Sequence, residues 1–361
     1  MESFEVLEIE DDTRWLEELK QVGTFDIYHL PSYHRLSETA GEGRGVMIIY
    51  KNNGLTVLFP LLLRRIQDLP FVKDMGKGFK DAVSVYGYGG PVASRMPVEE
   101  EKASFWKCLL DYLNSARVIS VFSSLHPLLG QENILRGLGE IMPTSPTISI
   151  DLTGTEEAQY SDYRKSHRRR LKGLEKEGCV CFEDREKQYW EEFEEIYLET
   201  MERANASRYY FFSKEYFSFL KKEMAQDIHL FVCLKGSTVI NAGTASLCNG
   251  IVQAHLGGTR KHYLALSPEV LSVDTLRAWG KEKGAHTLHL GRGFGGADDS
   301  LLHFKKGFSK RDHSFNFWKC IIRKDIYSQL YGELCRKTGV QPEGAYFPAY
   351  RHPAFFEGHP R

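Results

Sequence analysis

The segment Leu288–Phe308 carries the most information in the chain and reads LHLGRGFGGADDSLLHFKKGF. Its first residues are apolar and predict a strand, which runs into glycines that allow backbone amides to approach a ligand. Asp298, Asp299 or Ser300 can then cap a short helix that carries Lys305. The glycine spacing matches neither a P-loop nor a dinucleotide-binding fingerprint. On these residues alone, the segment is either an ordinary turn or a ligand site.

The chain before this segment places helices first and an antiparallel meander afterwards. The apolar periodicity predicts helices at 156–177, 187–204, 214–225 and 268–283, and strands at 147–152, 228–234, 238–248, 251–257, 286–290 and 315–322. The 268–283 helix lies between two of these strands. The pattern predicts an α+β lobe with a mixed, mostly antiparallel sheet flanked by helices.

The first 150 residues follow a similar order. We expect strands at 4–9, 45–50, 55–63 and 118–122, and helices from Asp12, after Pro31 and at 99–116. Asn52-Asn53-Gly54 is strong turn chemistry and predicts a hairpin. Duplication of one lobe is plausible, although no sequence repeat proves it.

The length supports two lobes, because 361 residues exceed one ordinary core. We expect an N-terminal lobe at 1–150, a second lobe at 151–324, and a C-terminal helix and tail at 325–361 that packs back on the lobes.

The composition is that of a globular protein, with 47 basic and 48 acidic side chains and a net charge of -1. This balance excludes a disordered chain and one that coats nucleic acid over its whole surface. The longest apolar run, 58–63, is too short to span a bilayer, and the first residues lack a secretory signal. We therefore expect a cytoplasmic protein.

The seven cysteines are scattered and include no CxxC pair. Cys179 and Cys181 would share one face of a strand, but further ligands are missing nearby. We expect reduced, mostly buried thiols and no metal site.

A concentrated basic patch occurs in the helix predicted at 156–177. Its apolar stripe contains Tyr160, Tyr163, His167, Leu171 and Leu174, which places His167 in the interior. The solvent side then carries Arg164, Lys165, Arg168, Arg169, Arg170 and Lys172. Like charges on adjacent turns repel, so the helix either binds a phosphate-rich partner or is a solvated surface balanced by the acidic 191–195 stretch.

Several motifs resemble the FemABX family. The glycine-rich strand end, the Ser300-Leu301 pair and Phe304-Lys305-Lys306-Gly307-Phe308 resemble the ending of that family. Other similar pieces are Tyr86–Pro91, the helix Ser166–Gly178, Tyr209-Tyr210-Phe211 and His255–Thr259. The resemblance covers nearly the whole chain, and it rests on the order and spacing of the motifs.

This resemblance implies two tandem GNAT-like lobes and transfer of an amino acid from aminoacyl-tRNA to an amine. The acceptor would be a peptide, a peptidoglycan precursor or a natural-product peptide, with no cofactor and no DNA partner. The long helical arm of some members is absent here. Coenzyme A would require a glycine-containing pyrophosphate turn, whereas Thr259–Leu266 contains no glycine.

The resemblance also implies roles for particular residues. Lys305 would be the catalytic cation. Substrate would be bound by Arg208, Tyr209, Tyr210, Arg35 and Arg292, and tRNA by Arg164, Lys165, Arg168, Arg169 and Lys172. Each cation also has a simpler interpretation as a surface charge or a structural ion pair, and the general base is not identified.

Two alternatives stay open. The first is an acyl-CoA-dependent N-acyltransferase on the same scaffold. The second, of another class, is a non-catalytic module that binds phosphate or RNA through the basic helix.

Overall fold

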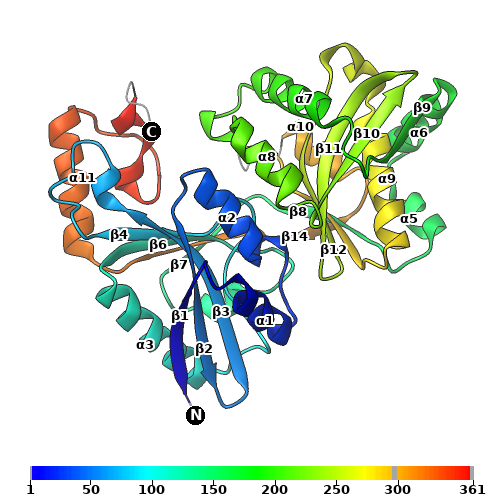
Figure 1. Cartoon of the computed structure of the whole chain (residues 1–361). Coiled ribbons are helices and arrows are strands. Elements are labelled where there is room, and N and C mark those ends of the chain that lie inside the picture. The colour runs from blue at the N-terminus through cyan, green and yellow to red at the C-terminus, as the bar shows by residue number, and fades with distance from the viewer. Residues whose placement is uncertain (1, 295–298, 358–361) are drawn as a thin grey trace. The chain divides into compact units, whose positions relative to one another are not determined.

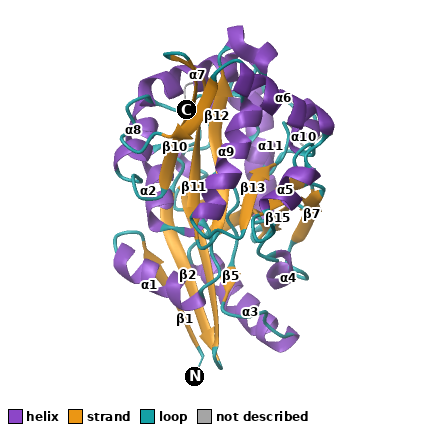
Figure 2. Ribbon diagram, turned by 90° about the vertical axis from the view of Figure 1, so that its right-hand side faces the viewer, coloured by secondary structure: helices purple, strands orange, loops and turns teal. Residues whose placement is uncertain are grey.

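A computed structural model of the chain describes residues 2–294 and 299–357. The chain divides into two compact units (Figures 1 and 2). The N-terminal unit contains the chain up to Thr144 together with the segment from Phe315 onward, and the central unit is Ser145–Ser314. Within the described part, no helix is both long and apolar enough to cross a membrane.

The described residues of the N-terminal unit form an eight-stranded mixed sheet. Its order is β1-β2-β3-β4-β6-β15-β7, with β5 paired to β3, and only β4 and β6 run parallel among these pairs. The strands are β1 (Ser3–Glu8), β2 (Arg44–Asn52), β3 (Leu55–Arg65), β4 (Lys80–Val83), β5 (Val92–Ala93), β6 (Val118–Ser124), β7 (Glu140–Pro143) and β15 (Asn316–Ile321).

The predicted hairpin is confirmed. Asn52 pairs with Leu55, and Asn53 and Gly54 adopt the positive φ values of 47° and 80° that a tight two-residue turn requires. Alternate residues of β2 and β3 pack on Phe105 and Leu109 in one core cluster. The helices of this unit are α1 (Asp12–Val22), α2 (Pro31–Thr39), α3 (Glu99–Ser115), α4 (Glu132–Leu135) and α11 (Lys324–Thr338).

The last strand belongs to a different sheet from the one expected. We assigned 315–322 to the second lobe, but β15 pairs antiparallel with β6 and β7 of the N-terminal unit. Trp318 is fully buried in that unit's core, and its indole nitrogen donates to the carbonyl of Leu138 at 2.5 Å. The apolar pattern identifies a strand but carries no information about which sheet edge receives it.

The central unit contains, among its described residues, a seven-stranded sheet in the order β14-β8-β13-β12-β11-β10-β9. These strands are β8 (Thr147–Asp151), β9 (Cys179–Glu183), β10 (Ile228–Lys235), β11 (Thr238–Cys248), β12 (Ile251–Thr259), β13 (Thr287–Gly291) and β14 (Arg311–His313). The helices are α5 (Glu156–Asp162), α6 (Lys165–Lys176), α7 (Trp190–Arg203), α8 (Lys214–Lys222), α9 (Glu269–Glu282) and α10 (Ser300–Lys305).

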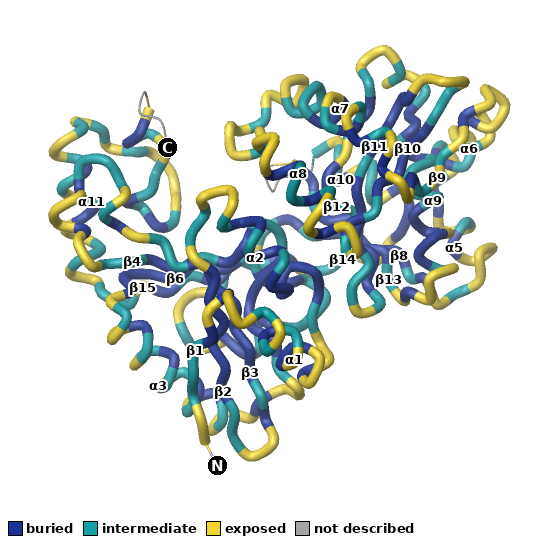
Figure 3. The backbone as a smooth tube through the Cα atoms, viewed as in Figure 1, coloured by how far each residue is buried: buried dark blue, intermediate teal, exposed yellow. Residues whose placement is uncertain are grey.

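Strands β12 and β13 are parallel neighbours that pair over only part of their length. Ile251–Gln253 pairs with Thr287–His289, after which β12 continues to Thr259 with no strand of the described chain paired on that side. Helix α9 connects the two strands, while α7 packs on β11 and β12 (Figure 1). Buried residues follow the strands of each sheet, and exposed residues lie on outer helical turns (Figure 3). The expected α+β class, with two mixed, mostly antiparallel sheets flanked by helices, is confirmed.

The basic segment is two helices and not one. The chain leaves the helical conformation at Tyr163 and Arg164, whose ψ values are 134° and 151°. Tertiary bonds explain the break, because the Tyr163 hydroxyl donates to Asp274 at 3.0 Å and the Arg164 amide donates to the Gly307 carbonyl at 2.8 Å. The apolar stripe nevertheless faces the interior on both sides of the break.

Candidate functional site

The glycine-rich strand end is packed against an aspartate. Leu288 and Leu290 anchor β13 in the core of the central unit, and Gly291 turns the chain with φ of 74°. A Cβ atom on Gly293 would lie 2.4 Å from Oδ1 of Asp299 and 2.6 Å from Oδ2. Gly293 is therefore required here by the close approach of a carboxylate.

Asp299 begins the short helix α10. Its Oδ1 accepts the amide hydrogen of Leu302 at 2.8 Å, so one of the three predicted caps is confirmed, while Asp298 lies outside the described residues. Its Oδ2 is buried and has no hydrogen-bond partner in the described chain. Buried Leu302 and Phe308 hold the helix on the core of the central unit. One carboxylate thus fixes both the glycine-rich turn and the start of α10.

Lys305 lies at the end of α10 and reaches back to the strand end. Its ammonium donates to the carbonyl of Arg292 at 2.6 Å. Burial lowers the pKa of Lys305 to about 8, the nearby Asp299 carboxylate opposes this shift, and Arg292 adds to it. The residue is partly exposed as a whole, although its ammonium is surrounded by protein. A group with this pKa is mainly protonated at pH 7, so Lys305 places a cation beside the glycine-rich turn.

Arg164 and His167 bind the C-terminal end of α10. The Arg164 guanidinium donates to Nε2 of His303 at 2.6 Å and to the carbonyls of His303 and Phe304, the latter at 3.1 Å. His167 is buried, and its Nε2 donates to the same Phe304 carbonyl at 3.0 Å. Burial lowers the pKa of His167, which agrees with its predicted place in the interior.

Gly307 explains part of the Phe-Lys-Lys-Gly-Phe motif. A Cβ atom at this position would lie 2.0 Å from Nε of Arg164 and 2.3 Å from Nε2 of His167. The glycine therefore allows α10 to dock on the start of α6. Arg164, which we expected to bind tRNA, is occupied by this docking.

The α6 basic face is the outward side of that helix. Lys165, Arg168, Arg169, Lys172 and Lys176 recur at helical spacing, and within the described chain their side chains form no hydrogen bond or ion pair. Arg170 points to another side and bonds to the hydroxyl of Ser267. The acidic 191–195 stretch makes no ion pair with α6; its Glu195 binds Arg260 at 3.1 Å. Among the described residues, the α6 basic face therefore has no ion-pair partner, and Lys176 joins the residues identified from sequence.

The remaining predicted substrate-binding residues differ in availability. Arg208 is exposed, and its side chain makes no hydrogen bond or ion pair with the described chain. Tyr209 beside it is 41% exposed, whereas the Tyr210 carbonyl accepts the Tyr197 hydroxyl at 2.8 Å. Arg35 lies in the other unit. Its guanidinium bonds to the Asp12 carboxylate at 3.2 Å and to the Ile9 carbonyl at 3.0 Å.

The N-terminus of α9 holds a carboxylate that sequence reasoning missed. Glu269 is the first residue of this helix, and its Oε2 accepts the hydroxyl of Thr259 at 3.4 Å. Burial raises the pKa of Glu269, and nearby Arg170 opposes the shift. The glycine-free connection before it forms a 3-10 turn at Lys261–Leu266. A carboxyl group therefore lies where a helix N-terminus would otherwise favour a phosphate. An acidic residue in the first turn after Pro268 was the available signal.

Comparison with known proteins identifies the fold. No family model and no curated protein matches the chain. The crystal structure of FemX superimposes with a TM-score of 0.65 at 12% identity, covering 87% of this chain and 97% of that one. The structure of L-PGS from Bacillus licheniformis gives 0.54 at 15% identity, with coverages of 93% and 99%. The C-terminal domain of a lysylphosphatidylglycerol synthetase candidate from Agrobacterium fabrum gives 0.52 at 10% identity, with coverages of 86% and 90%.

These likenesses establish architecture. The chain has the fold of FemX over most of its length, and the resemblance stated from sequence motifs is confirmed at that level. The chain also spans nearly the full length of each of these structures.

Proposed function

We propose that this protein is an aminoacyltransferase that joins an amino acid from aminoacyl-tRNA to an amine of a peptide, peptidoglycan-precursor or natural-product acceptor. The observation that carries the proposal is the Lys305 ammonium, held on the Arg292 carbonyl at the glycine-rich end of β13. The FemX fold and the unpaired α6 basic face support it from independent directions.

The reaction needs little beyond positioning and charge. An aminoacyl ester is already activated, so the acceptor amine attacks its carbonyl carbon, a C–N bond forms, and the ester C–O bond breaks to release the ribose hydroxyl. The tetrahedral intermediate carries a negative oxygen, which a fixed cation stabilises. One preorganised donor of this kind is worth about 3 to 4 kcal/mol. Lys305 is our choice for that donor, because Arg292 and Asp299 hold it in place before substrate binds.

The donor is proposed to be tRNA and not coenzyme A. The α6 basic face offers five cations at helical spacing to a phosphate backbone. The connection Thr259–Leu266 has no glycine, and Glu269 places a carboxylate at the start of α9. A diphosphate brought to that helix end would compete with the Glu269 carboxyl group for the same position, which disfavours the acyl-CoA alternative.

The acceptor is proposed to bind at Arg208 with Tyr209 and Tyr210. Arg208 is available, and an arginine fork suits a diphosphate of a nucleotide-linked or lipid-linked precursor. Arg292 contributes its side chain near Lys305. Arg35 is a weaker proposal because Asp12 already binds it.

The test is incubation of the purified protein with a pool of charged tRNA and cell extract, followed by mass spectrometry of new amides. RNase treatment before mixing should abolish the product, whereas removal of small molecules by desalting the protein should not. Because one fold neighbour is named as a lysylphosphatidylglycerol synthetase, the extract is also searched for aminoacylated lipid. Product that survives RNase and returns with acyl-CoA alone would support the acyl-CoA alternative. RNA binding without any transfer would support the non-catalytic module.

A further inference from the structure

Two cysteines face each other across strands β9 and β10. The register pairs Cys181 with Cys233, and β9 is the edge strand of its sheet. The amide of Asp184 donates to the carbonyl of Leu230 at 2.8 Å, which marks that pair as hydrogen-bonded. Hydrogen-bonded and non-hydrogen-bonded pairs alternate along an antiparallel ladder, so the cysteine pair, three positions away, is of the non-hydrogen-bonded type. Such pairs have Cα atoms about 4.5 Å apart. This separation lies within the roughly 4.4–6.8 Å range of disulfides.

The two side chains point to the same face and share one partner. The Ser272 hydroxyl on α9 lies 3.1 Å from Sγ of Cys233 and 3.8 Å from Sγ of Cys181. Cross-strand thiols on one face need no backbone movement to approach each other. Within the described chain, no group of three or more His, Cys, Asp or Glu side chains is placed to hold a metal. The arrangement therefore fits a thiol pair better than a metal site.

The two thiols are chemically unequal. Although burial acts to raise it, hydrogen bonds from Cys233, Thr275 and Ser272 lower the pKa of Cys181 below its usual value. Burial and the neighbouring Cys181 raise the pKa of Cys233 well above the usual value. Cys181 is half-buried, whereas Cys233 is fully buried. Cys181 is thus the more nucleophilic sulfur, and Cys233 is a protonated thiol beside it.

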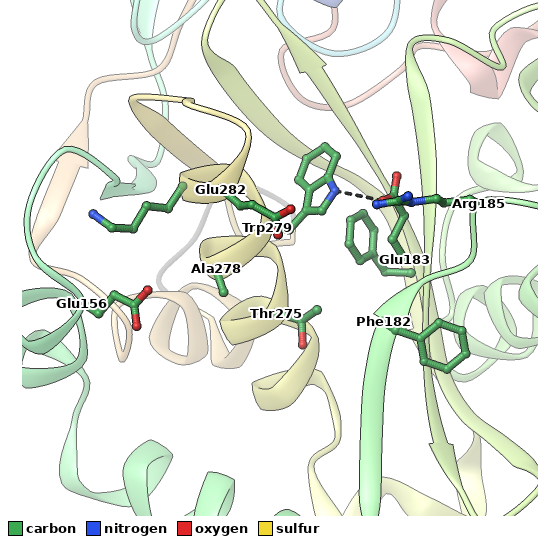
Figure 4. Close-up of a pocket in the computed structure, with 10 residues that line it drawn as sticks. Glu156, Phe182, Glu183, Arg185, Thr275, Ala278, Trp279 and Glu282 are labelled. Atoms are coloured by element: carbon green, nitrogen blue, oxygen red, sulfur yellow. Dashed lines mark hydrogen bonds and ion pairs between the residues drawn. The ribbon is translucent and has the colours of Figure 1, made fainter.

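A pocket lies close to the two cysteines. A cavity of about 820 Å³ lies between α9 and β9, and its lining includes Thr275, Trp279, Phe231 and Glu183 (Figure 4). Glu183 and Phe231 are the pair two positions beyond Cys181 and Cys233 along the strands, on the same face of the sheet. Thr275, in the pocket wall, also hydrogen-bonds Cys181. The Glu183 carboxylate in this lining accepts hydrogen bonds from Trp279 at 3.1 Å and His229 at 2.8 Å.

We propose that Cys181 and Cys233 form a redox-active pair that small hydroperoxides oxidise to a disulfide. The Cys181 thiolate attacks the terminal peroxide oxygen, the O–O bond breaks, and an alcohol leaves as Cys181 becomes a sulfenic acid. The Cys233 sulfur then attacks that sulfenic sulfur, forming the S–S bond and releasing water. The hydroperoxide is the two-electron oxidant, and an external thiol reverses the step.

Oxidation at this site would alter hydrogen bonds that extend to the start of α9. Ser272 also bonds to the amide oxygen of Asn241, whose Nδ2 donates to the Thr259 hydroxyl at 2.9 Å. Thr259 in turn bonds to Glu269. Disulfide formation removes the thiol hydrogens from this chain of hydrogen bonds, so the pair is linked to the end of β12 and the first turn of α9.

The test uses the full-length wild-type protein and cumene hydroperoxide. After oxidation, remaining thiols are alkylated and the protein is digested without reductant for mass spectrometry. The expected result is a linked peptide pair containing Cys181 and Cys233, which dithiothreitol removes. Oxidation that leaves both cysteines alkylated, or that converts Cys181 to a sulfinic acid without a linked peptide, would overturn the proposal.

Two variants separate the roles of the sulfurs. In Cys233→Ser, the Cys181 sulfenic acid has lost its cross-strand partner and should be trapped by dimedone. In Cys320→Ser, a thiol whose pKa burial raises to about 11 is removed from the other unit, and the disulfide should form as in the wild type. Circular dichroism melting confirms that each variant is folded. Absence of dimedone labelling in folded Cys233→Ser would also contradict the proposal.

Discussion

Lys305→Met is the most direct test of the proposed site. The substitution removes the cation beside the glycine-rich turn while keeping an unbranched apolar chain of similar length. The fold should survive. The lost hydrogen bond to Arg292 is worth about 0.5–1.5 kcal/mol. Burial of the ammonium is unfavourable, because it lowers the pKa of Lys305 to about 8. The substitution removes this unfavourable burial of charge, which offsets the lost hydrogen bond. We therefore expect the free energy of unfolding to change by no more than about 1 kcal/mol.

The effect on transfer should be much larger. Loss of one preorganised donor costs about 3 to 4 kcal/mol, or roughly 100-fold to 1000-fold in rate. We expect at least a tenfold lower single-turnover rate for amide formation from a preformed aminoacyl-tRNA. Lys306→Met is the matched control, since it removes an exposed lysine from the next position and should leave the rate near that of the wild type.

The pH dependence gives a second readout of the same group. Because the pKa of Lys305 is about 8, the ammonium is present below that pH and is lost as the pH rises through it. The wild-type rate should fall above pH 8 as the cation disappears. Lys305→Arg keeps a cation and should retain part of the rate without that fall. An unchanged single-turnover rate in folded Lys305→Met would refute the assignment.

Three further perturbations address other contacts. Asp299→Asn keeps an N-cap but removes the charge that raises the pKa of Lys305, so the fall in transfer rate with rising pH should begin at a lower pH. Asp299→Ala removes the cap as well and should therefore also destabilise α10. Replacing Arg168 and Arg169 with glutamine should weaken tRNA binding and reduce the slope of log affinity against log salt by about one unit per lost contact. The control, Lys107→Gln with Arg136→Gln, removes equal charge from the N-terminal unit. Equal slopes for the two double variants would mean that the α6 basic face is only a solvated surface. Gly307→Ala should lower the free energy of unfolding by about 1–3 kcal/mol, because the added Cβ would overlap Arg164. Gly173→Ala in α6 should raise the free energy of unfolding by up to about 1 kcal/mol, since its Cβ would have nothing within 4 Å. Thermal melts that rank the two variants in the opposite order would contradict the docking of α10 on α6.

The donor assignment combines two features of the central unit that are separate in the chain. The α6 basic face comes from one helix, and the carboxylate at the start of α9 comes from a residue about a hundred positions later. Neither feature alone excludes coenzyme A. Together they leave cations available for an extended polyanion and a carboxyl group at the helix end where a compact diphosphate would bind.

Local chemistry determined the elements of this protein from sequence. Asn53 and Gly54 specify their hairpin because the turn needs positive φ at both positions, whatever surrounds it. The apolar periodicity predicted that His167 lies in the interior, because α5 and α6 bury the same apolar stripe. The sequence also predicted the N-cap of α10 and the position of Lys305 on that helix, because capping depends on residues three positions apart.

Tertiary structure determined which of these elements and side chains meet. The strand Asn316–Ile321 reads alike in either sheet, and only its long-range hydrogen bonds place it between β6 and β7. The helix break at Tyr163 is stabilised by a hydrogen bond to Asp274, and the role of Arg164 is set by its hydrogen bonds to α10; both partners lie more than a hundred residues away in the chain. Cys181 and Cys233 likewise become partners through strand register, which the 51 residues between them do not encode locally. Sequence patterns report propensity over a few neighbouring residues, whereas ion pairs, docked helices and strand register depend on packing between distant segments.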